Sequence, residues 1–226
     1  MYSDLIAIYP AERLDADGLG KRPDLSMWIH AKQASLAARV LGRWLTRWME
    51  VFPETHPFNR YEDNNRTHWL KELAKADPQG FLKAVLPPML AAIRREELAI
   101  ERGELARPLI KVPFSQYDNL HVKLLAESFA SVAGTDPEFC TILLDLLPPH
   151  GEVPVYWQLK AIAANGEAFG HRLARLLYVS ETLSIGEHGG EWQAFAEAAR
   201  AAMPFLSCKE HSEVEQRILS YCPEYE

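Results

Sequence analysis

The sequence predicts an all-α protein, an array of antiparallel helix hairpins that stack into a solenoid-like helical repeat. In most segments of the chain, apolar residues recur every three or four positions, which is the period of a helix with one buried face. Pro and Gly interrupt these segments at short intervals, so consecutive helices are expected to turn back on one another. Strand character is confined to the opening residues and to the Pro-containing segment 106–114.

The composition is that of a globular protein. Hydrophobic residues make up 48% of the 226 residues and charged residues 24%, which argues against disorder. The formal net charge is −7. A negative chain lacks the favourable electrostatic term that dominates nucleic-acid binding, so we expect a protein partner and no nucleic acid.

No segment of the sequence has the features of a membrane-spanning helix or of a signal peptide. Pro or charged residues break every apolar stretch before it reaches the roughly 18 residues that a spanning helix needs. The first residues lack the basic start and the long apolar core of a signal peptide. The three cysteines are too few and too unevenly spaced for a disulfide framework. We therefore expect a cytoplasmic protein that does not associate with membranes.

The first predicted helix is rich in Trp and Arg and covers residues 26–52. Its apolar residues recur at helical spacing, and Arg39, Arg43 and Arg47 recur at every fourth position beside them. This basic stripe, together with Trp48, is the candidate surface for an acidic protein partner. The alternative is that the arginines form a solvated face and the tryptophans belong to the core.

An internal boundary is expected between residues 66 and 67. Residues 1–66 comprise an N-terminal loop and the Trp- and Arg-rich helix, and residues 67–226 form the helical-repeat module. The polar run NRYEDNNRT separates the two parts, after Pro53 and Pro57 have ended the helix. We expect the module to be one continuous array.

Two segments of the module have similar sequences. DPQGFLKAVLPP starts at Asp77 and DPEFCTILLDLLPP at Asp136, and both open on Asp-Pro and end on Leu-Pro-Pro. An Asp can cap a helix whose first residue is Pro, so each segment is predicted to begin a helix. In the first segment, Pro87 and Pro88 are expected to interrupt the helix, which then resumes as far as Gly103. This similarity indicates a repeated helical unit, or it is a coincidence that follows from the high frequency of such helix ends.

The stretch 136–165 is predicted to form a central antiparallel hairpin. A pair of prolines ends its first apolar run, Pro154 opens the second, and an Asn-Gly pair closes it. Neither helix can bury its apolar face without neighbours on both sides, so the rest of the chain must supply them. Further along, Ser207 and Glu210 have the spacing of a capping box and are predicted to begin the last helix.

No constellation of residues has the signature of a catalytic or cofactor site. The segment GLGKR lacks the Gly and Ser/Thr positions of a phosphate-binding loop, and the histidines are scattered singly. Cys208, His211 and Cys222 come nearest to a metal site but lack a fourth ligand, and the alternative is buried thiols beside a solvated histidine. We therefore predict a protein that is not an enzyme, with no catalytic residue, no cofactor and no metal.

The C-terminal half carries a specific pattern of turns and core positions. A leucine-rich helix leads to a Leu-x-Ile-Gly turn, a Trp-containing helix, a Pro-x-Leu-Ser junction and a final Leu-x-Tyr-x-Pro-x-Tyr-Glu. The positions of this pattern are Leu183, Gly186, Trp192, Pro204, Leu206, Ser207, Leu219, Tyr221, Pro223, Tyr225 and Glu226. Together with the segment around Trp69 and Asp77, it resembles the helical repeats of bacterial antiviral STAND NTPases, the signal-transduction ATPases with numerous domains.

This resemblance implies a non-catalytic section of the helical sensor or linker region that follows the nucleotide-binding module. In that family the region holds the enzyme inactive and recognises a foreign protein, commonly a viral component. The sequence has no P-loop and no effector domain, so ATP hydrolysis is not assigned to it. We expect a fragment of a larger protein, with the loops at 57–66 and 184–190 as further contact candidates. The alternative is a free-standing helical scaffold or adaptor.

Overall fold

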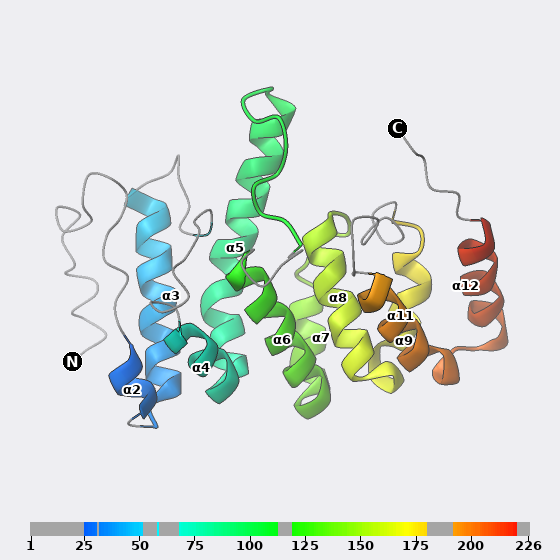
Figure 1. Ribbon diagram of the computed structural model, residues 1–226, viewed down its shortest axis with the longest axis horizontal. Helices are drawn as coiled ribbons and strands as arrows, with labels where there is room; N and C mark the ends of the chain where they lie inside the picture. Colours follow the sequence, from blue (N-terminus) through cyan, green and yellow to red (C-terminus); the bar gives the residue numbers. More distant parts are fainter. Residues whose placement is uncertain are drawn as a thin grey trace. The chain divides into compact units, whose positions relative to one another are not determined.

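The computed structural model describes residues 25–30, 32–51, 58, 68–112, 119–179 and 192–220, except for the side chain at 192. Within these ranges the chain forms α-helices and one short 3-10 helix and contains no strand, which confirms the predicted all-α class (Figure 1). The elements are α2 (Ser26–His30), α3 (Ala34–Val51), α4 (His68–Ala76), α5 (Pro78–Glu101), α6 (Leu120–Thr135), α7 (Pro137–Leu144), α8 (Glu152–Ala164), α9 (Gly166–Leu176), α11 (Trp192–Ala202), η2 (Met203–Phe205) and α12 (Cys208–Ser220).

The chain divides into two compact units. Unit 1 comprises residues 1–110 and 119–125, and unit 2 comprises residues 111–118 and 126–226, so that α6 contributes residues to both. The predicted boundary between residues 66 and 67 lies outside the described residues and stays a prediction. In unit 1, α3, which precedes that boundary, packs against α5, which follows it.

The predicted helix over residues 26–52 is divided into α2 and α3. Lys32 adopts a left-handed backbone conformation with φ of 59°. The N–H of Lys32 donates to the Ile29 carbonyl at 2.9 Å, and the N–H of Gln33 donates to the Trp28 carbonyl at 2.7 Å. These two bonds form a Schellman ending. The left-handed position usually belongs to Gly, so a Lys there gave no sequence signal that a helix ends.

The predicted interruption at Pro87 and Pro88 is wrong, because α5 runs unbroken through both residues. Each internal proline removes a backbone hydrogen bond and costs about 3 kcal/mol in a helix. The same turns bury Val85, Leu86 and Met89 almost completely. Burial of each such side chain contributes about 1.5–3 kcal/mol. Apolar packing therefore outweighs the local preference of the two prolines.

The contact between α3 and α5 is close. A Cβ atom added to Gly42 of α3 would lie 3.1 Å from the Cα of Ala84 in α5. The two helices contribute large apolar side chains to the core of unit 1, including the fully buried Leu41, Leu45 and Phe81. A glycine at the point of closest approach lets the backbones come near enough for these side chains to interlock.

Three single residues each end one helix and begin the next. They are Asp77 between α4 and α5, Asp136 between α6 and α7, and Asn165 between α8 and α9. Their backbone angles nearly coincide, with φ of −143°, −148° and −147° and ψ of 74°, 77° and 81° respectively. The helix starts predicted at Asp77 and Asp136 are confirmed.

The side chain and backbone of each junction residue serve both helices. Each N–H donates to the carbonyl four residues earlier, at 2.9, 2.7 and 3.0 Å for Asp77, Asp136 and Asn165. Each side-chain oxygen accepts from the N–H three residues later, at 2.9, 3.1 and 3.1 Å. In addition, Nδ2 of Asn165 donates to the carbonyl of Ala133 in α6 at 2.8 Å. One residue thus satisfies polar groups at two helix ends.

Unit 2 is centred on α8, α9 and α11, which contact one another. Trp157 and Ile162 of α8 are fully buried, and the Trp157 ring stacks on Phe129 of α6 with the ring centroids 6.0 Å apart. The start of α9 meets the end of α11 backbone to backbone, because a Cβ atom on Gly166 would overlap the carbonyl of Ala201. Only a glycine at this position permits the contact.

The helix α12 begins at the predicted capping box. The N–H of Ser207 donates to Oε2 of Glu210 at 2.9 Å, and the N–H of Glu210 donates to Oγ of Ser207 at 3.3 Å, which confirms the prediction. α12 contacts α9 and buries Val214. Arg217 of α12 donates from Nε to the Leu177 carbonyl at 3.1 Å, at the C-terminal end of α9, where a cation is favourable.

Replacing Gly166 with Ala should destabilise the protein by about 1–3 kcal/mol, since the added methyl group must push the α9 and α11 backbones apart. Gly134→Ala in α6 is the matched control, because a Cβ atom there meets nothing within 4 Å. We expect Gly134→Ala to be neutral or to stabilise by up to about 1 kcal/mol. Urea unfolding followed by circular dichroism measures both variants. Equal stability of the two would contradict the close contact.

Candidate functional site

The predicted basic stripe lies on the exposed side of α3. Arg39, Arg43 and Arg47 are spaced four residues apart, so they project from one side of the helix, and all three are exposed. Nη1 of Arg47 lies 3.0 Å from Oε2 of Glu50, and these side chains are 44% and 57% exposed. An ion pair this exposed contributes at most about 1 kcal/mol. Arg47 can therefore exchange it for an acidic group of a partner at little cost.

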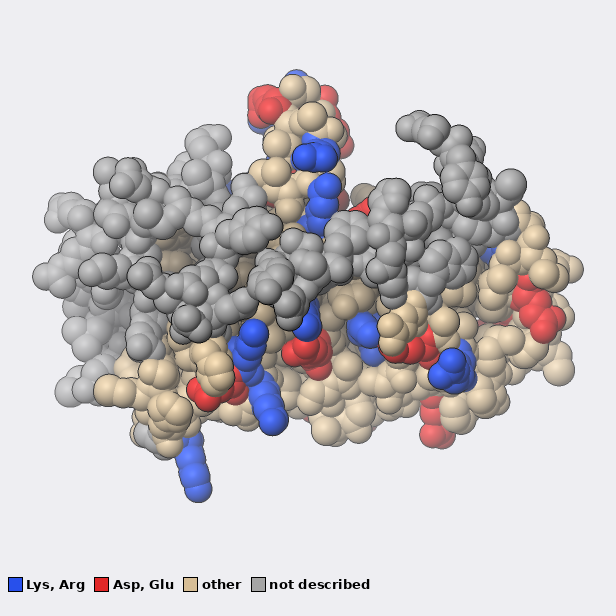
Figure 2. Space-filling view, in the orientation of Figure 1, with Lys and Arg blue, Asp and Glu red and all other residues tan. Residues whose placement is uncertain are grey.

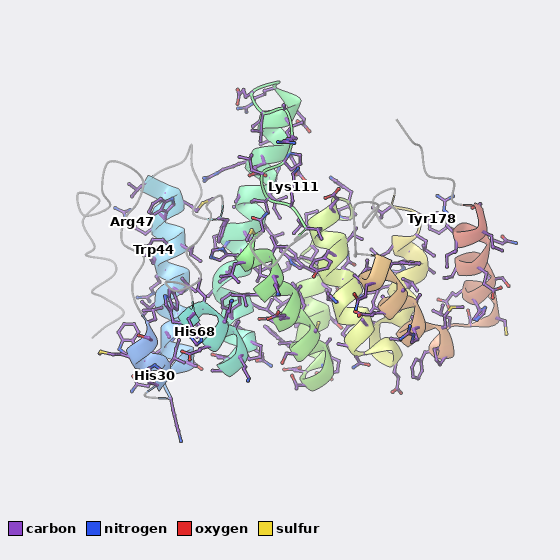
Figure 3. All side chains as sticks on the ribbon, viewed as in Figure 1. His30, Trp44, Arg47, His68, Lys111 and Tyr178 are labelled. Carbon is purple, nitrogen blue, oxygen red and sulfur yellow. The ribbon has the colours of Figure 1, made fainter. Side chains whose placement is uncertain are left out.

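Trp48, the fourth predicted member of this surface, is a buried residue of the same helix. Its side chain is only 5% exposed and packs on Trp44, with the ring centroids 5.3 Å apart and the planes tilted by 46°. Figure 3 labels Trp44 and Arg47 on this helix. Trp69 and Trp157 are also buried, as the core interpretation of the tryptophans predicts. Trp48 can fix the position of the stripe, while the arginines provide its accessible charge.

The end of α5 forms an arm, of which the sequence predicted the helix end near Gly103 but not the attachment of the returning chain. Arg95 of α5 lies beside the end of α3, where Nη2 donates to the Met49 carbonyl at 3.4 Å. Beyond Arg95 the helix continues to Glu101, about 9 Å further at the usual rise (Figure 1). Gly103, with φ of 73°, then ends the helix in a Schellman motif and the chain returns. We call residues 96–110 the α5 arm.

One buried carboxylate fixes the α5 arm. Glu96 is 6% exposed, and its Oε2 accepts hydrogen bonds from the N–H groups of Leu109 and Ile110, both at 2.9 Å. A buried carboxylate is costly unless it is hydrogen-bonded, so these bonds hold the returning chain against the helix. Leu98 and Leu109 remain 40% and 39% exposed. The arm is thus an ordered element that presents apolar and charged side chains.

Glu96→Ala should release the returning chain, because a part-buried and a buried N–H group lose a charged acceptor worth about 1.5–3 kcal/mol each. We expect hydrogen exchange at the amides of Leu109 and Ile110 to accelerate at least about tenfold. Glu101→Ala, which removes an exposed glutamate from the same helix, is the control and should leave that exchange unchanged. NMR or mass spectrometry measures the exchange. Unchanged protection of these two amides in Glu96→Ala would show that Glu96 does not hold the returning chain.

A second feature absent from the sequence predictions lies at the end of α9. Tyr178, labelled in Figure 3, is 68% exposed. The guanidinium carbon of Arg217 in α12 lies 5.6 Å from its ring centroid. Such a cation–π contact contributes about 0.5–1 kcal/mol at an exposed site. Exposed tyrosines with an apolar ring and a polar tip are favoured at protein interfaces. The two residues are far apart in sequence, so only the packing of α12 on α9 brings them together.

The cysteines have different environments. Cys140 is fully buried in α7, and burial raises the pKa of its thiol to about 12, although the positive charge of Arg172 opposes this shift. Cys208, at the start of α12, is exposed. The interpretation of Cys208 as a buried thiol is therefore wrong, because the capped end of α12 points it to solvent. Cys222 lies outside the described residues, which hold no cluster of three potential metal ligands.

Iodoacetamide at pH 8 should label Cys208 of the folded protein and leave Cys140 unmodified until the chain unfolds. A thiol with a pKa of about 12 is ionised in only about one molecule in ten thousand at this pH, and burial also blocks access. Mass mapping of peptides after timed labelling, with and without urea, measures both sites. Comparable labelling of Cys140 and Cys208 in the folded protein would contradict the burial of Cys140.

Charges of both signs are interspersed on the described part of the face shown in Figure 2. In unit 2, Nζ of Lys160 in α8 lies 3.0 Å from Oε2 of Glu197 in α11. The hydrogen bond from Lys160 holds the pKa of Glu197 below its usual value. This ion pair joins two helices of the unit. Within the described ranges, no helix is long and apolar enough to cross a membrane.

Most residues of the two loops predicted as partner contacts lie outside the described residues. Of the segments 57–66 and 184–190, only Phe58 is described. It is 2% exposed and packs edge-on against His121, with the ring centroids 5.0 Å apart. Phe58 thus belongs to the core of unit 1 and offers no contact surface.

Comparison with known proteins identifies no relative of this chain. No protein-family model matches the sequence, and no curated protein or solved structure matches it. The functional assignment therefore depends on the geometry of the described residues and on the pattern of turns in the sequence.

Proposed function

We propose that the chain is a non-catalytic helical-repeat module for protein recognition or regulation. The observation that carries this proposal is the recurrence of one junction at Asp77, Asp136 and Asn165, with the same backbone angles and the same pair of capping bonds. Recurrence of a local unit is the defining property of repeat proteins, in which each unit contacts its neighbours and the stack creates an extended surface.

The junctions favour antiparallel hairpins stacked as a solenoid. At each junction a single residue separates two helices, and so short a connection favours a second helix that folds back toward the first. The pairs would be α4 with α5, α6 with α7 and α8 with α9. The two helices of the hairpin predicted over residues 136–165, α7 and α8, would then belong to adjacent pairs. The helix α12, joined to α11 through η2 and the Ser207 cap, contacts α9 and would extend the array by a different connection. Stacked pairs bury a continuous apolar core and leave one helix of each pair for contacts.

The surface chemistry supports a protein partner. The arginine stripe of α3 would bind an acidic surface, while Trp48 holds the helix that carries it. The net charge of −7 disfavours nucleic acid. The proposed module is cytoplasmic and uses no cofactor or metal. Its buried carboxylate, Glu96, is occupied in holding the α5 arm.

We further propose that the module belongs to the sensor or linker region of a bacterial STAND-type antiviral ATPase. The resemblance of its closing pattern, from Leu183 to Glu226, supports this assignment. The partner would then be a viral protein or another domain of a larger chain. The module would change the state of an ATPase located elsewhere, by binding and not by chemistry of its own.

Charge reversal of the stripe tests the recognition role. The variant Arg39→Glu, Arg43→Glu, Arg47→Glu should weaken partner binding by about tenfold or more, because three attractive contacts become repulsive. Its thermal unfolding should match the parent, since all three residues are exposed. The readout is the set of proteins that the tagged chain retains from lysates of infected and uninfected source cells, quantified by mass spectrometry.

The matched control reverses Lys71, Lys75 and Lys83, which are exposed on α4 and α5 of the same unit. Both triple variants have the same formal net charge, so a non-specific charge effect would weaken them equally. Loss in the arginine variant alone supports the stripe as the contact. Retention of the same partner by the arginine variant would show that the stripe is only solvated surface.

The assignment to a larger ATPase predicts the size of the native protein. An antibody against this chain should detect, in the source cell, a band several times heavier than the 25.6 kDa calculated from the sequence. Peptide sequencing of that band should then reveal a P-loop. A band of the calculated mass would refute the fragment proposal and would favour the free-standing scaffold or adaptor.

A further inference from the structure

We draw no further inference here: the strongest candidate, the exposed apolar pair Ile142 and Leu146 at the end of α7 beside the Asp145–Arg172 ion pair, is an unpartnered helix face, and nothing in the structure shows what covers it.

Discussion

Three residues, Asp77, Asp136 and Asn165, each hold two helix ends at once, and the arrangement of the helices depends on them. A helix leaves unpaired N–H groups at its start and unpaired carbonyls at its end, and a junction of one residue leaves no room for a separate cap at each. Each junction residue meets both demands with its own N–H and its side-chain oxygen. The direction of the second helix is therefore fixed relative to the first within a single residue.

Small residues set the distances at which the helices then pack. Gly42 brings α3 against the backbone of Ala84, and Gly166 brings α9 against the backbone of Ala201. At this separation the buried Trp, Phe and Leu side chains of the cores fill the space between helices. The junctions and the glycines act together, because a fixed turn leads to packing only if the second helix can come close to its neighbour. This combination brings the helices of each contact close enough for their side chains to pack.

Two polar side chains, those of Glu96 and Asn165, bind backbone groups of the fold. Glu96 binds two backbone N–H groups of the α5 arm, and the Asn165 amide binds a carbonyl of α6. The exposed groups are of a different kind: a row of arginines on α3, and Tyr178 beside Arg217. Charged and aromatic groups on ordered helices suit recognition of another protein, where affinity comes from a few well-placed side chains.

The sequence by itself determined the all-α class, the caps at Asp77 and Asp136 and the capping box at Ser207, because each depends on residues adjacent in the chain. It also placed the arginine stripe on one side of a helix, since helical spacing is a local property. Tertiary structure decided the continuity of α5 through its two prolines, where burial outweighs local preference. Tertiary structure alone also decided the hydrogen bonds of Glu96 with the returning chain and the contact of Tyr178 with Arg217. Packing brings these residues together, and no local sequence pattern encodes such contacts.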